Sequence, residues 1–559
     1  MPRTSITFER GFFPSAAPVG PNRVPNSARD GQNVLFLGEG IVKSAKGLGP
    51  GPNIPSGQRV YLVGSKIGVV DGVGSVVSYT RDTFFWVSDA QVNVDGLLLP
   101  ATGGALKFYF NNQVYNAGLP APDAPMLSAG PAGQNSGTFS IVITRKRSFT
   151  NGESNPSPKV KITVNGKQIT ITFPSVPAVS DPNYHDMWGI YSTFANDSTE
   201  GSLRFLRDVS SSLQSVTLEW GDDDLASLNP PTDHNPPPPA KFVIAIGGQL
   251  ILIGTFGGPN TGVFAGVSSS LPNQPDSYPS LLTTYLNPQE TPIGLAGGAE
   301  GEYFIWTKNS LQSLLAAGDG LVQVRPIWSK LGIQGPHGGA FCNSEFYCFT
   351  GKAGPTRLGA GFQPDTTFAR PVREWIRQQG WNSANVVVGH DPVYDSAVFM
   401  HGNIALPYMR SEDRWSCPIV LNATGTAKAA LTFEGSLLVG VGSGLYEWET
   451  GTLEQPWYVI PSWQEAPRSG DRITITGYCV ACDLGSSTLT TDLLLDFSNT
   501  PVAGASITDS QSGPRYTNWT HINKRCRNFT FKHSGMGRDH YIHNTEVEFL
   551  YPGAIREKK

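Results

Sequence analysis

The feature of this sequence that most restricts its fold is a repeated unit of two short apolar runs joined by a pair of turn-forming residues. In "KFVIAIGGQLILIG" the pair is Gly247 and Gly248, and in "VKITVNGKQITITF" it is Asn165 and Gly166. Such pairs accept the positive φ angles of primed turns, whose twist matches that of two antiparallel strands. Both segments are therefore predicted to be β-hairpins, and the second carries the strongest hairpin signal in the chain.

Similar units recur along the whole sequence. Further turns between paired strands are predicted around Lys308–Asn309, His401–Gly402, Glu434–Gly435 and Gly442–Gly444, within "RVYLVGSKIGVVDG", and between Val34–Leu37 and Ile41–Ser44. The best helix candidate is "ARPVREWIRQQGW", where Val372, Trp375 and Ile376 share one helix face before Gly380. Short strands separated by turns at intervals of about 8–12 residues predict an all-β sandwich, barrel or propeller.

Composition agrees with an all-β globular chain. Of the 559 residues, 63 are Gly and 44 are Pro, and aromatic residues make up 10%. Charged residues make up only 15%, against about 25% in an average soluble domain. Many turn formers and many aromatic residues are typical of short-stranded β-proteins, whereas disordered chains are poor in aromatic residues.

Two proline-rich stretches divide the chain. They are "NAGLPAPDAPMLSAGPAGQNSG" and "LASLNPPTDHNPPPPAKF", and the second contains four consecutive prolines, which form a stiff extended linker. Between them, residues 121–239 hold about seven short alternating strands, the size of an immunoglobulin- or fibronectin-like sandwich. After Trp463 the sequence changes character again, so residues 464–559 are predicted to form a separate C-terminal β-module.

Charge argues against one large class of function. The net charge is −4, so there is no basic excess with which to hold nucleic acid by its phosphates. Residues 521–559 carry eight basic and four acidic residues, which fits either a solvated segment or a partner-binding patch. No signal-peptide-like run and no stretch of about 18 apolar residues is found, so we expect a protein without a membrane span, made in a reducing compartment.

Candidate metal ligands are few. Cys479 and Cys482 form a single C-x-x-C pair, without the second pair or nearby histidines that a structural zinc site needs, in a segment that alternates like a strand. His540 and His543 would lie on opposite faces of a strand, and Asp222–Asp224 fits no EF-hand loop. No metal and no other cofactor is therefore predicted.

Motifs of known catalytic chemistry are also missing. The sequence contains no G-x-S-x-G nucleophile elbow, no H-E-x-x-H helix and no G-x-G-x-x-G placed between a strand and a helix. A glycosidase remains open, because a pair of catalytic carboxylates leaves no local motif. We name no catalytic residue and expect that the chain is not an enzyme.

The order of several segments carries a resemblance. These are "ARDGQNVLFLGEGIVKSAKGL", "TRKRSFTNGESNPSP", "MWGIYST", "SSSLPNQPDSYPSLLTTYLNPQETPIGLAGGAEGEYFIWTKNSLQSL" and "GSLLVGVGSGLYEWE". Together they resemble the tail nozzle proteins of short-tailed bacteriophages, also called tail tubular protein B. The resemblance covers most of residues 28–449. Lys46 stands where the opening motif of that family has Arg, and Tyr278 where a blade motif often has Trp.

The resemblance implies a β-propeller with an inserted immunoglobulin-like sandwich. On this basis residues 1–120 are expected to form an N-terminal arm and the first blades, 121–239 the inserted sandwich, 240–463 the remaining blades and 464–559 the C-terminal β-module. It further implies a structural protein of the virion, made in the host bacterial cytoplasm, of which six copies form a ring at the distal end of the tail. That ring would dock on the portal-attached tail adaptor, help to anchor tail fibres and let double-stranded DNA pass without reading its sequence.

Two alternatives from other classes remain. One is a phage propeller enzyme that cleaves cell-surface glycans, and the other is a receptor-binding or fibre protein that acts on such glycans. An enzyme of this kind should show a cleft with two carboxylates about 5–10 Å apart. A nozzle should instead show two unlike lateral faces, because a closed ring is made from heterologous contacts.

Overall fold

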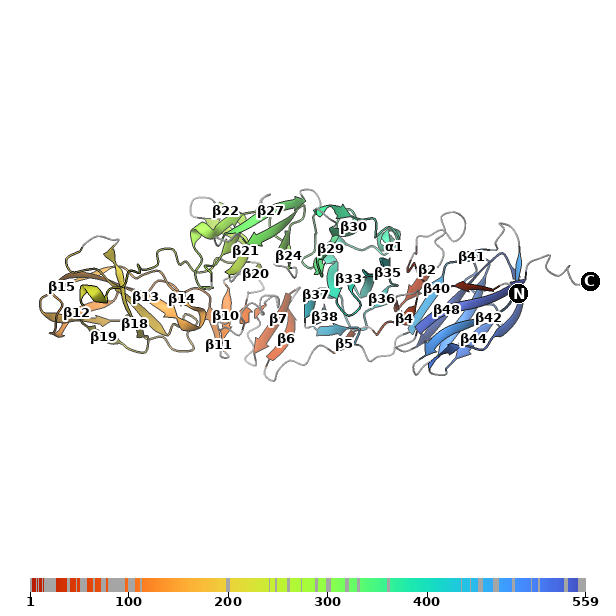
Figure 1. Ribbon diagram of the computed structural model, residues 1–559, viewed down its shortest axis with the longest axis horizontal. Helices are drawn as coiled ribbons and strands as arrows, with labels where there is room; N and C mark the ends of the chain where they lie inside the picture. The colour runs from red at the N-terminus through yellow and green to blue at the C-terminus, as the bar shows by residue number, and fades with distance from the viewer. Residues whose placement is uncertain are drawn as a thin grey trace, which may run out of the picture.

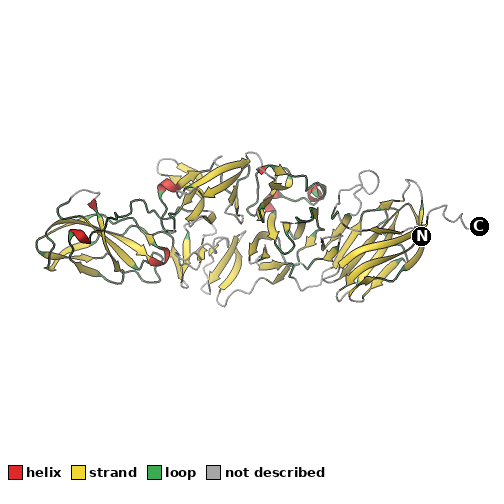
Figure 2. Ribbon diagram, viewed as in Figure 1, coloured by secondary structure: helices red, strands yellow, loops and turns green. Residues whose placement is uncertain are grey.

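The computed structural model describes residues 3–550, with short gaps and with longer ones at 15–26, 51–57, 72–76, 79–95, 99–105, 298–302, 451–455 and 466–471. Between residues 58 and 98 it describes the course of the strands and not their side chains. The described chain is built almost entirely of β-strands, and its one α-helix is α1 (Arg373–Gln378) (Figure 2). This helix lies inside the segment predicted to be helical, and it is followed by Gly380 with φ +65°.

Seven antiparallel sheets of the described chain occupy the middle of the elongated molecule (Figure 1). The first two are β6 (Gln58–Val63), β7 (Lys66–Asp71) and β8 (Val77–Ser78), then β9 (Gly96–Leu98), β10 (Lys107–Phe110) and β11 (Gln113–Asn116). The third and fourth are β20 (Phe242–Ile246), β21 (Gln249–Gly258), β22 (Gly262–Ser269) and β23 (Thr283–Tyr285), then β24 (Gly294–Gly297), β25 (Tyr303–Trp306), β26 (Leu311–Ala316) and β27 (Val322–Trp328). The fifth is β28 (Gly339–Cys342), β29 (Glu345–Thr350), β30 (Gly354–Leu358) and β31 (Pro364–Asp365).

The last two sheets complete the series. The sixth is β32 (Val387–Asp391), β33 (Ser396–His401), β34 (Ile404–Met409), β35 (Arg414–Trp415) and β36 (Ile419–Val420). The seventh is β37 (Ala427–Phe433), β38 (Ser436–Val441) and β39 (Gly444–Trp448), and it takes its fourth strand, β5 (Leu48–Pro50), from the N-terminal part of the chain. Through β5 this sheet joins the chain ahead of β6, and β39 and β37 lie against β6 and β7 of the first sheet.

Apolar side chains join each sheet to the next. Ile253 packs with Ile305 between the third and fourth sheets, Phe304 packs with Phe346 between the fourth and fifth, and similar clusters continue to the seventh. The first strands β24, β28, β32 and β37 lie against one another in succession, as inner strands of blades do. The chain therefore has an all-β, propeller-type fold.

A β-sandwich interrupts this series between β11 and β20 and forms one end of the molecule (Figure 1). One sheet contains β12 (Met126–Ala132), β16 (Lys167–Thr172) and β19 (Ser215–Leu218). The other contains β13 (Gly137–Arg147), β14 (Gly152–Glu153), β15 (Val160–Val164), β17 (Met187–Ser192) and β18 (Arg204–Ser210). Alternate residues of both sheets, among them Ile143, Ile171 and Trp188, fill the core between them.

The prediction of a hairpin at Asn165 and Gly166 is wrong. Gly166 does adopt a left-handed turn conformation, with φ +59°. However, β15 pairs with β13 and β16 pairs with β12 and β19, so the turn carries the chain from one sheet to the other. Turn residues indicate a reversal of chain direction, and alternating apolar and polar residues indicate a strand with one buried face. Neither signal indicates which strand is the hydrogen-bonded neighbour.

The other tested hairpins are confirmed. Antiparallel pairing joins β20 to β21, β25 to β26, β33 to β34, β37 to β38, β38 to β39, β6 to β7 and β3 to β4. Gly402 and Gly435 have φ angles of +62° and +80°, as their turns require. The predicted turn residues Gly247, Gly248 and Glu434 lie outside the described residues.

A second sandwich forms the other end of the molecule and combines both ends of the described chain. Its first sheet contains β1 (Arg3–Ile6), β3 (Val34–Phe36), β4 (Val42–Ser44), β42 (Ile473–Leu484), β45 (Gly513–Tyr516), β46 (Thr520–Cys526) and β48 (Tyr541–Leu550). Its second sheet contains β2 (Ala28–Gln32), β40 (Pro456–Pro461), β41 (Gln464–Glu465), β43 (Leu489–Leu495), β44 (Ser506–Asp509) and β47 (Asn528–Met536). We call this unit the terminal module.

The terminal module differs from the expected domain division. The sequence predicts that residues 1–120, which contain β1–β4, form an N-terminal arm and the first blades, and that the C-terminal β-module begins at 464. Instead Thr4 pairs with Val547, Gly31 pairs with Val459, and the module already includes Pro456. Local composition could not reveal partners that lie more than 400 residues away along the chain.

Asn33 connects the terminal module to the propeller. It lies between β2 and β3, where the chain crosses from one sheet to the other, and it is buried with φ +57°. Its backbone N–H donates to the Pro418 carbonyl (2.7 Å), and its side-chain oxygen accepts from the Val420 N–H (2.7 Å). Its side-chain nitrogen donates to the Pro456 carbonyl (2.7 Å), and its own carbonyl accepts from the Ala45 N–H (2.9 Å). One residue thus joins both sheets and the sixth blade.

Replacing Asn33 by Gly tests this connection. Gly keeps the left-handed conformation without strain, so the variant removes only the two side-chain hydrogen bonds and leaves Val420 and Pro456 unsatisfied. We expect the free energy of unfolding to fall by about 2–5 kcal/mol, measured by denaturant titration. Asn343→Gly is the matched control, since Asn343 is exposed with φ +54° and should lose less than about 1 kcal/mol. Equal losses in the two variants would contradict the special role of Asn33.

His533 links the two sheets of the terminal module from inside its core. The side chain is fully buried on β47, its Nδ1 lies 2.9 Å from the Thr491 hydroxyl, and its Nε2 lies 3.1 Å from the Thr545 hydroxyl. Burial lowers the pKa of His533 to about 3. Since the folded protein holds this imidazole neutral, acid must protonate it preferentially in the unfolded chain.

This predicts an acid-sensitive terminal module. The pKa in the folded state lies below the ordinary value of about 6.5, so the stabilisation is complete above pH 6.5 and is lost as the pH falls toward 3. Between pH 6.5 and pH 5 the loss amounts to about 2 kcal/mol. His533→Gln, which can still reach one threonine, should show a smaller drop in melting temperature over that interval than the unmodified protein. Identical drops would contradict this assignment.

Candidate functional site

A buried ion pair joins the inserted sandwich to the propeller. Arg147 lies at the end of β13, and Asp276 lies in the connection between β22 and β23. Their Nη1 and Oδ1 atoms are 3.0 Å apart, and both side chains are completely buried. Asp276 also accepts hydrogen bonds from the Gly118 N–H (2.5 Å) and from the Thr150 hydroxyl. The carboxylate therefore receives donors from the sandwich and from the segment that leads into it.

The surroundings of Arg147 complete this junction. The guanidinium donates to the carbonyls of Asn116 and Tyr184, each at 2.9 Å, and lies 5.7 Å and 5.4 Å from the ring centroids of Tyr115 and Phe149. The arginine is thus held between the segment that leads into the sandwich and residues of the sandwich itself, as a planar cation with aromatic neighbours.

The inserted sandwich and the propeller approach each other closely. A Cβ atom added at Gly152 would lie 2.4 Å from Asp276 Oδ2, so only glycine fits there without a shift. The returning linker is tied as well, since the Asn155 side chain contacts Asn235 (3.2 Å) and His234 Nδ1 lies 2.9 Å from the Glu153 carbonyl. The sandwich is therefore fixed at several points to the third blade and to the segments that lead into and out of the sandwich.

The junction predicts a large effect of Asp276→Ala. This change leaves the Arg147 charge buried without its carboxylate, which costs about 3–5 kcal/mol. We expect a lower melting transition by calorimetry, with part of the loss recovered in the double variant Arg147→Met with Asp276→Leu. The exposed pair of Arg377 and Glu374, 2.5 Å apart, is the control, and Arg377→Met should change stability by less than about 0.5 kcal/mol. An Asp276→Ala protein as stable as this control would refute the inference.

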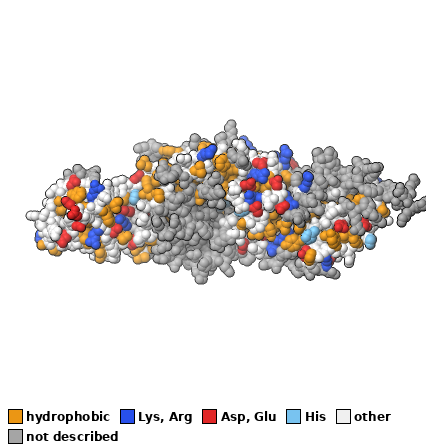
Figure 3. Space-filling view, viewed as in Figure 1, with side chains coloured by type: hydrophobic (Ala, Val, Ile, Leu, Met, Phe, Trp, Pro, Cys, Tyr) orange, Lys and Arg blue, Asp and Glu red, His pale blue; other side chains and the backbone are white. Residues whose placement is uncertain are grey.

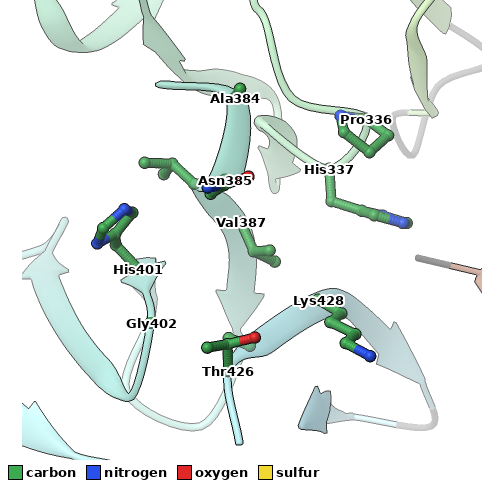
Figure 4. A pocket seen from close by; sticks show the side chains of 11 residues that line it. Pro336, His337, Ala384, Asn385, Val387, His401, Gly402, Thr426 and Lys428 are labelled. Carbon is green, nitrogen blue, oxygen red and sulfur yellow. The ribbon is translucent and has the colours of Figure 1, made fainter. Parts of the chain in front are cut away.

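A cavity opens on the propeller where the inner strands of three successive blades begin (Figure 4). Its volume is about 480 Å³, within the range of small-molecule pockets. The lining comes from the segment before β28, the start of β32, the turn between β33 and β34, and the start of β37: Pro336, His337, Ala384, Asn385, Val386, Val387, His401, Gly402, Thr426, Ala427 and Lys428. No Asp or Glu belongs to this lining.

His401 is held in one tautomer at the edge of this cavity. The Asn382 N–H donates to His401 Nε2 (3.2 Å), so the ring proton lies on Nδ1. The ring stacks on Trp381 with a centroid distance of 5.5 Å, and burial lowers the pKa of His401 below its ordinary value. At neutral pH this side chain is therefore an uncharged hydrogen-bonding group.

A second, shallower cavity of about 630 Å³ lies on the terminal module. It is lined by Gln32, Pro456, Trp457, Tyr458, Thr488, Thr490, Lys532, Ser534, Gly535 and Met536. Lys532 Nζ lies 5.3 Å from the centroid of the Tyr458 ring. This lining also contains no Asp or Glu, so neither of the two cavities brings together the carboxylate pair of a glycoside hydrolase.

Carboxylates gather instead around two arginines of the fifth and sixth blades, where Figure 3 shows mixed charges over β30 and β33. Arg410 contacts Glu345 (3.2 Å) and Asp395 (2.5 Å), and Arg357 contacts Asp365 (2.7 Å). Burial favours the neutral form of Asp365, but hydrogen bonds from Thr367 and Arg357 outweigh it and lower the pKa. Asp365, with its lowered pKa, is therefore a poor proton donor.

The residues considered as metal ligands do not converge. Cys479 and Cys482 are buried in β42, but Cys482 belongs to the core between the two sheets and Cys479 lies on the opposite face of the strand. Burial raises the pKa of Cys482 to about 11. Asp222–Asp224 forms an exposed 3₁₀ turn, and His543 is exposed on β48, while His540 lies outside the described residues. All six cysteines are described, and none forms a disulfide.

No group of three or more His, Cys, Asp or Glu side chains in the described chain is placed to hold a metal ion. No helix among these residues has the length and hydrophobicity needed to cross a lipid bilayer.

Comparison with known proteins finds no matching sequence family and no matching curated protein. Among solved structures the chain is similar to a chain of a nidogen/laminin complex (9% identity, TM-score 0.25, covering 58% of this chain and 89% of that one). It is also similar to YCF48 bound to a D1 peptide (9%, 0.26, 59% and 98%) and to a glucose dehydrogenase (12%, 0.25, 46% and 92%). Structural similarity this weak supports no conclusion about function. The fold assignment rests on the sheet topology.

Sequence reasoning named neither the junction nor the cavity. Arg147 stands in the run "TRKRS", which is indistinguishable from a solvated basic segment, and Asp276 is a single acid between prolines and serines. The proline-rich borders did signal that a junction exists. The cavity residues come from four separate segments and share no motif.

Proposed function

We propose that this chain is a structural protein of a phage tail, forming the nozzle ring through which double-stranded DNA leaves the particle. The observation that carries the proposal is the order of the units: a propeller-type series of blades interrupted after its second sheet by a sandwich. This is the order that the resemblance to tail nozzle proteins implies, and the motif "TRKRSFTNGESNPSP" spans the junction built by Arg147. The chain is proposed to act as a homo-hexamer bound to the tail adaptor and to tail fibres, without catalysis.

The fixed junction supports a mechanical role. A ring that holds DNA under pressure needs subunits whose parts keep their relative orientation. In this chain the sandwich is clamped by Arg147 and Asp276, and the terminal module shares an apolar core with the fifth and sixth blades, where Phe349, Phe399 and Phe531 belong to one cluster. Both ends of the elongated molecule are therefore firmly joined to its centre.

An apolar patch on the rim of the propeller offers a surface for contact between copies. It consists of Leu281, Tyr285, Leu315 and Leu321, whose exposed fractions are 85%, 51%, 38% and 36%. These residues lie on or beside β23, β26 and β27, and hydrophobic side chains lie at the surface over this region in Figure 3. We call them the rim patch. Large exposed apolar side chains of this kind favour association between copies.

Electron microscopy of the intact particle, with the purified protein alongside, tests the proposal. We expect six copies around the tail axis at the end away from the capsid, enclosing a channel wide enough for a duplex of roughly 20 Å. Trimeric spikes that project sideways, or absence of the protein from the tail axis, would refute the nozzle and favour the fibre or glycan-cleaving alternatives.

The rim patch gives a residue-level prediction. Leu281→Glu combined with Leu315→Glu should abolish rings of the purified protein, because two charges would have to be buried at the contact. Native mass spectrometry measures the loss. Val393→Glu is the matched control, since Val393 is 68% exposed on a separate turn of the sixth blade. Rings that persist in the double variant would exclude the rim patch as the lateral contact.

A further inference from the structure

The propeller cavity has the chemistry of a ligand site that the proposed ring does not use. Lys428 is an exposed residue of β37, and Thr426 is the exposed residue immediately before this strand, while Ala427 between them is buried. Figure 4 shows the side chains of Lys428, Thr426 and His337 extending toward the same side. A cation and two hydrogen-bonding groups therefore face one region of the cavity.

The charge of the cavity lining determines which sign of charge a ligand should carry. The Lys428 ammonium forms no ion pair with any residue that the structure describes, and the lining contains no carboxylate that could neutralise it. Hydrogen bonds from a charged donor to an anionic oxygen are about twice as strong as neutral ones. The site therefore favours a carboxylate or phosphate group over a cation or a neutral polar group.

The size and the remaining lining select the body of the ligand. A cavity of about 480 Å³ is much larger than an inorganic oxyanion needs. Pro336, Val387 and Ala427 supply apolar wall for a carbon skeleton, while Asn385 and His401 supply polar groups for hydroxyls. Apolar walls with a few placed polar groups are typical of small-molecule sites.

We propose that this cavity binds a sugar-sized organic anion. The carboxylate or phosphate group lies against Lys428 and Thr426, and the hydroxylated carbon body lies against β32. The side chain of Asn385, which is exposed and makes no hydrogen bond within the described chain, reaches the hydroxyls. This site belongs to a single subunit and is independent of the ring.

Saturation-transfer NMR on the full-length protein tests the site with two anionic probes, galacturonate and glucose 6-phosphate, and their neutral counterparts, galactose and glucose. We expect at least one anion to bind, with an affinity about tenfold or more above that of its neutral counterpart. The two probes distinguish a carboxylate ligand from a phosphate ligand. Failure of both anions to bind, or equal binding of the neutral sugars, would overturn the proposal.

Variants locate the site. Lys428→Met should weaken binding of the anion about tenfold or more, Lys428→Arg should retain it, and Thr426→Val should reduce it. Since both residues are exposed, unchanged melting temperatures will show that these variants fold. Lys352→Met is the matched control, because Lys352 is an exposed lysine on the turn between β29 and β30. Binding that survives Lys428→Met, or that Lys352→Met weakens equally, would place the ligand elsewhere and refute the assignment.

Discussion

The hydrogen bonds of Asn33 join the two sheets of the terminal module to each other and to the sixth blade of the propeller. The closed fold depends on this connection. Within residues 28–50 the chain contributes β2 to one sheet of the terminal module, β3 and β4 to the other, and β5 to the last blade of the propeller. Asn33 stands at the first crossing and binds the sixth blade through Pro418 and Val420. Closure of the blade series by β5 is therefore coupled to assembly of the terminal module, and neither can be rearranged alone.

The two ends of the molecule are attached to the propeller by different kinds of interaction. The terminal module shares a continuous apolar core with the blades, and the close packing of Gly31 on Cys417 illustrates how little space separates them. The fit of many closely packed apolar side chains sets the geometry of this contact. The sandwich is attached by the buried pair of Arg147 and Asp276, which contributes little net stability because both charges lose their hydration. What such a pair supplies is geometry, since only one orientation satisfies its hydrogen bonds.

Local features of the fold were predictable, whereas long-range ones were not. Hairpins such as β33–β34 follow from a turn residue and two adjacent apolar runs, all within about 15 residues of sequence. The Asn165 and Gly166 turn shows the limit, because the same signals also occur where a strand passes from one sheet of a sandwich to the other. The partners of β1–β4 and the contact of Arg147 with Asp276 depend on segments far apart in the sequence. The cavity could not be predicted for the same reason, as Lys428 and His337 meet only after three blades are stacked.

The split origin of the terminal module has a consequence for the synthesis of the chain. Strands β1–β4 leave the ribosome first, but β42, β47 and β48, which pair with them or complete their sheets, are made last. At about 5–20 residues per second, the roughly 500 intervening residues take on the order of 25–100 s. Throughout that time Phe8, Phe12 and Phe36, fully buried in the finished protein, lack the strands of the terminal module that complete their core. The nascent N-terminal segment therefore exposes apolar side chains for a long time. The sandwich and the central blades, whose strands pair with neighbours in the sequence, can fold during that time.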